Sequence, residues 1–367
     1  MIIFYIMCPS NLKDMFKNSI TTAKQLAEYY PSMDIDLDAV GRVIKKYPML
    51  INPYIAQQLR NPDNPFWKQA VPHIDEIDVN DGIIDPLAEE KFSPVVNITH
   101  RYPDRVLFLV SNQCAMYCRF CTRKRKIGKD FKVDAETINV GIEYIQRNEQ
   151  ITDVLVSGGD PFMLEDDSLA DILSRLRAVS HVETIRIGTR VPILFPQRVT
   201  ENLAKMLSRF QPLYINTHIN HSDEITDEVR SACGFLSNAG ISLGCQTVLL
   251  KGINDTPDIM KKLMKKLLQT RIRPYYLHHG DMTRGASHFR TTIKTGLDIV
   301  SSMRGNISGM CVPHYVIDLP GGGGKVPLLP EAVCGIEGDD LLIKNYQGKM
   351  FKYRVDEEDR KIFKINN

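Results

Sequence analysis

The hydrophobic pattern of the chain changes near residue 96. Before this point, apolar residues recur at helical spacing over 21–30 and 38–47, and the prolines at 53, 62 and 65 are predicted to interrupt the chain beyond residue 50. After it, short apolar runs typical of strands alternate with helical patterns. The predicted strands are Val106–Val110, Asp153–Val156, Thr184–Ile187, Leu213–Ile215, Ser242–Leu250 and Pro274–Leu277. The predicted helices between them are Ala135–Gln146, Leu169–Val179, Glu201–Phe210, Thr226–Asn238 and Pro257–Gln269.

This alternation predicts parallel βα units and the α/β class. Six such strands favour a partial (βα)6 barrel over a doubly wound sheet, and periodicity alone leaves both open. We expect a mainly helical region over 1–95, the barrel core over 96–310 and a C-terminal segment over 311–367. Both folds bind ligands at the carboxyl ends of their strands, so the polar residues that follow the strands form the candidate site.

The composition narrows the class of protein. Of the 367 residues, 43% are apolar and 25% are charged, as in globular domains, and the net charge of +2 gives no case for nucleic acid or an anionic membrane as partner. The chain has no apolar run of transmembrane length, and its first residues lack the basic region of a signal peptide. Eight cysteines without disulfide-like pairing indicate a reducing compartment, and we expect the cytoplasm.

Three of the cysteines follow the first predicted strand as C-x3-C-x2-C: Cys114, Cys118 and Cys121. Thiolates at this spacing can hold a metal centre. Structural zinc and ordinary iron–sulfur clusters take four ligands, whereas three cysteines leave one iron of a [4Fe–4S] cluster open for another molecule. A zinc knuckle is the alternative. The other cysteines are isolated and are interpreted as buried thiols: Cys8, Cys233, Cys245, Cys311 and Cys334.

Further polar groups follow later strands. The glycines of VSGGDP would let the backbone approach a ligand closely, and Asp160 could accept a hydrogen bond from an ammonium or hydroxyl group. His218 follows the fourth strand and Gln246 lies in the fifth. The loop after the sixth strand gathers histidines, Asp281 and Arg290. A solvated polar loop is the simpler interpretation of that segment, but its density of polar and aromatic groups favours a site.

Lys325 follows four glycines in PGGGGK. The segment is not a phosphate-binding P-loop, because Leu319 replaces the first required glycine and Val326 replaces the Ser or Thr after the lysine. A lysine on a flexible glycine ribbon can instead form an imine with an aldehyde, as pyridoxal phosphate requires.

Together these motifs resemble the lysine 2,3-aminomutase family of radical SAM enzymes over residues 95 to 350. The segments that carry the resemblance are HRYPDRVLFLVSNQCAMYCRFCTRKR, SGGDP, RIGTRVPILFPQR, LYINTHINH, RPYYL, HFRT and DLPGGGGKVPLLP. The resemblance implies a TIM-like partial barrel that encloses a [4Fe–4S] cluster, S-adenosylmethionine and pyridoxal 5′-phosphate. It also implies an isomerase in which a 5′-deoxyadenosyl radical starts migration of the amino group between L-lysine and L-β-lysine.

The resemblance also implies residue roles. Cys114, Cys118 and Cys121 would bind the cluster, and Lys325 would bind pyridoxal phosphate. The residues implied around S-adenosylmethionine are Gly158, Gly159, Asp160, His218 and Gln246, and those around the cofactor phosphate are Arg101, Tyr102 and Arg105.

For the substrate, the resemblance implies that Arg123 pairs with the carboxylate and that Asp281 and Asp318 bind the distal ammonium. Two carboxylates around one ammonium would select a cationic side chain. The expected partners are therefore a small amino acid and an electron donor, in a possible homo-oligomer. We expect no zinc site, because no cysteine follows Cys334 and Thr256 stands where the family's zinc cysteine would be.

Alternatives remain at this point. The enzyme could supply β-lysine for modification of elongation factor P, or act on arginine or glutamate. A non-catalytic iron–sulfur or zinc protein is the rival from a different class.

Overall fold

The computed structural model describes residues 12–59, 62–79, 81–128 and 131–357. Its core is a sheet of nine strands in sequential order, with β2 to β8 parallel and the two edge strands, β1 and β9, antiparallel to their neighbours. The strands are β1 (Ile98–Tyr102), β2 (Arg105–Ser111), β3 (Asp153–Gly158), β4 (Thr184–Gly188), β5 (Leu213–Thr217), β6 (Ser242–Leu249), β7 (Ile272–His279), β8 (His314–Leu319) and β9 (Gly324–Pro327).

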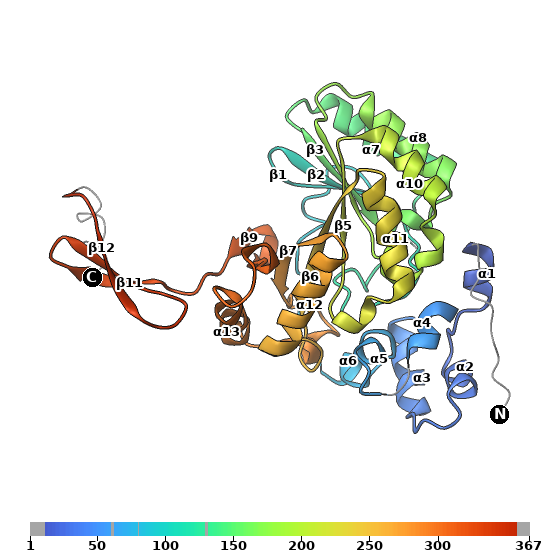
Figure 1. Cartoon of the computed structure of the whole chain (residues 1–367). Coiled ribbons are helices and arrows are strands. Elements are labelled where there is room, and N and C mark those ends of the chain that lie inside the picture. The colour runs from blue at the N-terminus through green and yellow to red at the C-terminus, as the bar shows by residue number, and fades with distance from the viewer. Residues whose placement is uncertain (1–11, 60–61, 80, 129–130, 358–367) are drawn as a thin grey trace.

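A helix follows each of β2 to β7 and lies along the outer side of the sheet (Figure 1). These helices are α7 (Ala135–Arg147), α8 (Asp166–Arg177), α10 (Glu201–Leu207), α11 (Asp227–Asn238), α12 (Pro257–Gln269) and α13 (Ile293–Met303). Six βα units in sequential order confirm the partial barrel, because a doubly wound sheet would reverse its strand order. The structure adds α13 to the predicted units and places the segment that contains Asp318 in the sheet as a seventh parallel strand, β8.

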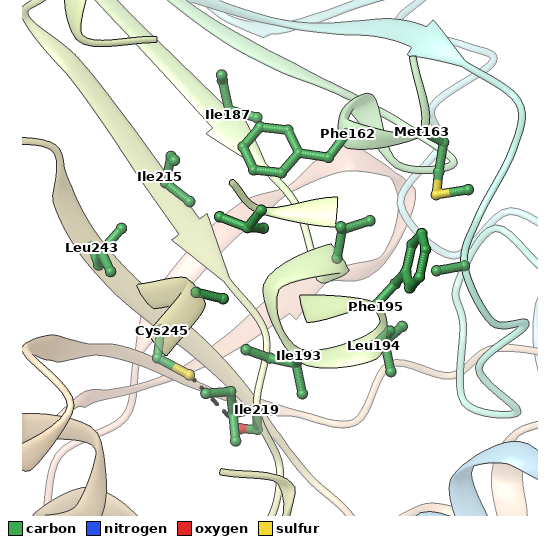
Figure 2. Packing of buried hydrophobic residues seen from close by; sticks show 14 of the residues in the cluster. Phe162, Met163, Ile187, Ile193, Leu194, Phe195, Ile215, Ile219, Leu243 and Cys245 are labelled. Carbon is green, nitrogen blue, oxygen red and sulfur yellow. Dashed lines mark hydrogen bonds between the residues drawn. The ribbon is translucent and has the colours of Figure 1, made fainter. Parts of the chain in front are cut away.

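Alternation along the strands separates the core from the interior of the barrel. In β4, Ile185 and Ile187 are buried towards the helices, whereas Arg186 and Gly188 line the central cavity. Figure 2 shows the apolar side, where Ile187, Ile215 and Leu243 come from three neighbouring strands. They pack with Phe162 and with residues of the short helix α9 (Val191–Leu194). Burial of the apolar face fixes the register and orientation of each strand, so the residues on the opposite face can be polar.

Short helices cover one end of the barrel (Figure 1). They are α1 (Leu12–Lys17), α2 (Ala23–Tyr29), α3 (Leu37–Lys46), α4 (Pro53–Gln58), α5 (Pro65–Ala70) and α6 (Asp75–Asp78). The prediction that Pro53 and Pro65 interrupt the chain was wrong. Each occupies the first turn of a helix that Asn52 or Asn64 caps, where the missing N–H costs little.

A second sheet, β10 (Val333–Glu337), β11 (Asp340–Lys344) and β12 (Met350–Arg354), projects from the body (Figure 1). Strands β8 and β9, although they follow residue 310, belong to the core sheet; the division at 95 and 310 stays a prediction. Within the described ranges, no helix combines the length and hydropathy needed to cross a bilayer.

Three of the isolated cysteines, Cys233, Cys245 and Cys311, are buried thiols, as predicted. Cys334 is exposed, so that prediction was wrong for it, because β10 lies in the projecting sheet. Cys8 lies outside the described residues.

Candidate active site

A cavity of about 650 Å³ occupies the interior of the barrel and reaches the carboxyl ends of its strands. All the predicted site residues line it except Gly158, which directly precedes the lining residue Gly159. The predicted residues in the lining are Arg101, Tyr102, Arg105, Cys114, Cys118, Cys121, Arg123, Gly159, Asp160, His218, Gln246, Asp281, Asp318 and Lys325. The fold therefore brings together motifs that are spread over more than 200 positions.

The loop that carries the three cysteines is bonded to the glycines after β3. The Gly159 N–H donates to the Ser111 carbonyl at 2.6 Å, and the Asp160 N–H donates to the Gln113 carbonyl at 2.6 Å. A Cβ at Gly158 would lie 2.3 Å from the Ser111 oxygen, and one at Gly159 would lie 2.3 Å from the Gln113 oxygen. Both positions therefore require glycine, and they fix the cysteine loop against the sheet.

Asp160 is engaged by its own chain. Its carboxylate accepts from the Thr189 hydroxyl at 2.6 Å and from the backbone N–H groups of Phe162 at 3.0 Å, Arg190 at 2.7 Å and Val191 at 3.1 Å. These four donors use both oxygens and tie the end of β3 to the end of β4. Asp160 thus shapes the cavity wall, and its contact with S-adenosylmethionine stays a prediction.

Pairing of β8 with β9 brings Lys325 and Asp318 together, and we call this pair with Arg101 and Tyr102 the lysine corner. Lys325 and Asp318 are direct partners in the antiparallel β8–β9 register, and the Lys325 Nζ lies 3.0 Å from Asp318 Oδ2. Arg101 from β1 reaches Asp318 Oδ1 at 3.2 Å, and the Tyr102 hydroxyl accepts from the Lys325 N–H at 3.0 Å. The sequence suggested a loose glycine ribbon; the structure places Lys325 at the start of a paired strand.

The two aspartates differ in electrostatics. Burial would raise the pKa of Asp318, but its contact with His278 and the charge of Lys325 outweigh burial and hold that pKa well below its ordinary value. Burial, and then the charge of Asp318, raise the pKa of Asp281 to about 7. Asp318 is therefore an ionised partner of Lys325, whereas Asp281 exchanges its proton near neutral pH.

Arg123 already has a buried counter-ion. Its Nε donates to Glu89 Oε1 at 2.7 Å, and the Glu89 side chain is 4% exposed and also pairs with Arg125. Arg105 pairs with the exposed Asp104 and lies 5.2 Å above the Tyr102 ring. Both arginines reach the cavity with an orientation that these partners fix.

His218 lies deep in the cavity beside the cysteine loop. Its Nε2 is 2.9 Å from Asn220 Oδ1, and its ring centroid is 5.3 Å from that of Phe120. Burial holds the pKa of His218 well below its ordinary value, so the ring is neutral at physiological pH.

A buried ion group joins α6 to the cysteine loop, and no motif in the sequence pointed to it. The Glu76 carboxylate, with a side chain 0% exposed, pairs with Arg119 at 2.6 Å and Lys124 at 2.9 Å. The Lys124 Nζ also donates to the Gly285 carbonyl at 2.7 Å. Burial would raise the pKa of Glu76, but the two cations outweigh it and lower that pKa, whereas burial lowers the pKa of Lys124 to about 8.

Replacing Glu76 with glutamine should therefore destabilise the protein by about 1–3 kcal/mol, because two buried cations lose their only carboxylate partner in this group. Denaturant unfolding of the wild type and the variant measures the difference. Asp78→Asn on the same helix is the control, since Asp78 pairs with Arg42 in solvent and should cost less than about 1 kcal/mol. Equal stability of wild type and Glu76→Gln would contradict the importance of this group.

The residues present fit the implied cofactors. Three free thiols on one loop face the cavity, the Lys325 amine lines the same cavity, and arginines are available for anions. Arg290 also lines the cavity, and its buried Nε has no hydrogen-bond partner within the described part of the chain.

Comparisons with known proteins agree with this chemistry. Residues 108–263 match the family model described as Radical SAM superfamily, and residues 300–363 match the one described as Lysine-2,3-aminomutase. The chain is 48% identical over 319 residues to the L-lysine 2,3-aminomutase of Methanococcus maripaludis, covering 86% of this chain and 74% of that one. It is 44% identical over 351 residues to the L-lysine 2,3-aminomutase of Acetoanaerobium sticklandii, covering 95% and 84%. The glutamate 2,3-aminomutase of Clostridioides difficile is 39% identical over 346 residues, covering 94% and 82%.

Proposed function

The chain belongs to the lysine 2,3-aminomutase family of radical SAM enzymes, and from this membership we propose how its own residues divide the work of the reaction. It is an isomerase that moves the amino group between C2 and C3 of L-lysine, with a [4Fe–4S] cluster, S-adenosylmethionine and pyridoxal phosphate. When bound, these groups supply the radical that takes hydrogen from the substrate and the ring that carries the migrating nitrogen.

We assign cluster binding to Cys114, Cys118 and Cys121, because they are free thiols on one loop that faces the cavity. Gly158 and Gly159 hold this loop against β3, and Asp160 holds β3 against β4. His218 and Gln246 complete the wall on that side of the cavity and are assigned to S-adenosylmethionine.

We assign the bond to pyridoxal phosphate to Lys325. Arg101 and Tyr102, which contact Asp318 and Lys325, and Arg105, which stacks on Tyr102, are placed to receive the phosphate. Asp318, which Lys325 and His278 hold ionised at this end of the cavity, is assigned to the distal ammonium of lysine.

The observation that carries the choice of substrate is the pair Asp281 and Asp318 in one buried cavity. Both carboxylates are within electrostatic reach of Lys325, and together they favour a cation at the far end of the substrate. At the other end, Arg123 is oriented by Glu89 to meet the α-carboxylate. A glutamate side chain would bring a third carboxylate to the aspartates, and repulsion should exclude it.

An anaerobic assay tests this function. We expect the protein, supplied with iron, sulfide, pyridoxal phosphate, S-adenosylmethionine and a strong reductant, to form β-lysine from L-lysine and to leave L-glutamate unchanged. L-Arginine run in parallel tests the length of the pocket. Turnover of glutamate or arginine in preference to lysine would overturn the substrate assignment. Supply of β-lysine for modification of elongation factor P stays a prediction.

We also propose a cytoplasmic setting with a low-potential electron donor, since a cluster with an open iron requires reducing conditions. A homo-oligomer and the absence of zinc stay predictions.

A further inference from the structure

Arg190 is a buried arginine that the assigned roles do not use. It follows β4, occupies the N-cap position of α9 without a side-chain capping hydrogen bond, and lines the cavity with 8% of its side chain exposed. Its Nη1 lies 2.9 Å from the sulfur of Cys118, the middle cysteine of the motif, and its Cζ lies 5.3 Å from the centroid of the Phe120 ring.

Three other contacts hold this guanidinium in place. The Nε donates to the His218 carbonyl at 3.1 Å, and Nη2 donates to Gln69 Oε1 at 2.7 Å and to Glu224 Oε2 at 3.0 Å. The backbone N–H of Arg190 donates to Asp160 at 2.7 Å, so the main chain is fixed as well. The side chain therefore has one orientation, and that orientation points a donor at the Cys118 sulfur.

Glu224, the acid that pairs with Arg190, accepts several other hydrogen bonds. Glu224 has a side chain 0% exposed, and its Oε1 accepts from the Gln69 amide at 2.9 Å and from the N–H groups of Asn220 at 3.0 Å and His221 at 2.9 Å. Glu224 thus spreads its charge over four donors, and it lies on the Nη2 side of the guanidinium, whereas Cys118 lies on the Nη1 side.

We propose that Arg190 is a positioning residue that raises the reduction potential of the cluster bound by Cys114, Cys118 and Cys121, through its N–H···S hydrogen bond to Cys118. The proposal rests on the proposed function, since it requires the cluster on these cysteines. Reduction transfers one electron from an external low-potential donor to the cluster, whose net charge becomes more negative by one. A hydrogen bond to a ligating sulfur and a nearby fixed cation both stabilise the more negative state.

The test is a redox titration followed by electron paramagnetic resonance of the reconstituted protein, with pyridoxal phosphate present and S-adenosylmethionine left out. We expect Arg190→Gln to lower the midpoint potential so that, at a given potential, the ratio of reduced to oxidised cluster falls about tenfold, which is about 59 mV for one electron. Arg190→Lys keeps the charge, but one ammonium cannot reach Glu224, the His218 carbonyl and Cys118 together, so we expect a smaller shift in the same direction.

Arg198→Gln is the matched control. Arg198 is also largely buried and ion-paired, at 2.6 Å to Asp166, and donates to backbone carbonyls, but it does not line the cavity. We expect no shift in its midpoint. Iron and sulfide content confirm that each variant holds an intact cluster, and if Arg190→Gln does not fold, the Arg190→Lys variant decides.

The outcomes separate two failures. A wild-type protein without the signal of a reduced [4Fe–4S] cluster would refute the cluster assignment and the proposed function. A normal wild-type signal with unchanged midpoints in both Arg190 variants would overturn the role of Arg190 alone. The same holds if the midpoints change only when the titration is repeated with S-adenosylmethionine, because that result would make Arg190 a ligand of its carboxylate.

Discussion

Replacing Lys325 with arginine should abolish the visible absorbance of protein-bound pyridoxal phosphate and lower the turnover of L-lysine by roughly 10⁴-fold or more. Arginine keeps the positive charge that Asp318 pairs with at 3.0 Å, so the lysine corner stays folded. A guanidinium is protonated at all working pH values and does not form the imine that an amine forms. The variant therefore removes the bond to the cofactor and leaves the ion pair.

The cluster should be unaffected in this variant, because the cysteine loop is held by contacts from the segment after β3, from Glu76 and from Arg190, and none of these contacts involves Lys325. The electron paramagnetic resonance signal of the reduced cluster in Lys325→Arg tests this expectation. Lys344→Arg, in the projecting sheet, is the control and should behave as the wild type. If Lys325→Arg retains the cofactor absorbance, another lysine carries the cofactor and the assignment is wrong.

Local spacing predicted much of this site, because motifs of a few residues specify their own geometry. The cysteine triplet, the paired glycines and the lysine after PGGGG all line or border one cavity. The sequence did not show that Asp318 and Lys325 pair across two strands, because a run of glycines has low strand propensity and hides β9.

Helix α13 was missed for a related reason. Gly296 lowers its helix propensity, but a Cβ at this position would lie 2.1 Å from the Tyr315 ring, so glycine is required by the packing of the helix on β8. Tertiary contact thus overrides the local preference at this position.

The charged partners were also hidden from the sequence. Glu76 lies 43 residues before Arg119, and Glu89 lies 34 residues before Arg123, in a region without any chemical motif. Such acids look like ordinary surface charges until the fold buries them. Asp160 shows the reverse case, since its motif suggested a ligand contact and the structure gives its oxygens to four internal donors.

Asp281→Asn should lower kcat/KM for L-lysine by roughly 100-fold, or about 3 kcal/mol, because a desolvated ammonium loses one of its two carboxylates. Binding of pyridoxal phosphate should not change, and the preference for lysine over glutamate should narrow. Asp298→Asn on α13 is the control, since Asp298 is exposed and pairs with Lys294 at 2.6 Å. Equal use of lysine by Asp281→Asn and the wild type would remove Asp281 from the selection of substrate.

The pH dependence of kcat/KM distinguishes a loss of substrate recognition in Asp281→Asn from simple structural damage. The pKa of Asp281 is raised to about 7, so below this pH the neutral acid attracts the substrate ammonium weakly, and kcat/KM of the wild type should rise as the pH increases through 7. The asparagine variant should lack that rise.

Asp281→Asn should be more stable than the wild type at high pH, although it is less active. A carboxyl whose pKa is higher in the folded than in the unfolded state binds its proton more tightly when folded, so its contribution to stability is lost as the pH rises from about 4 to 7. Asp281→Asn should therefore unfold at a higher temperature than the wild type at pH 8, with little difference at pH 4, while remaining the poorer enzyme. A variant that is both less active and less stable at pH 8 would show that Asp281 supports the fold and not the recognition of a cationic substrate.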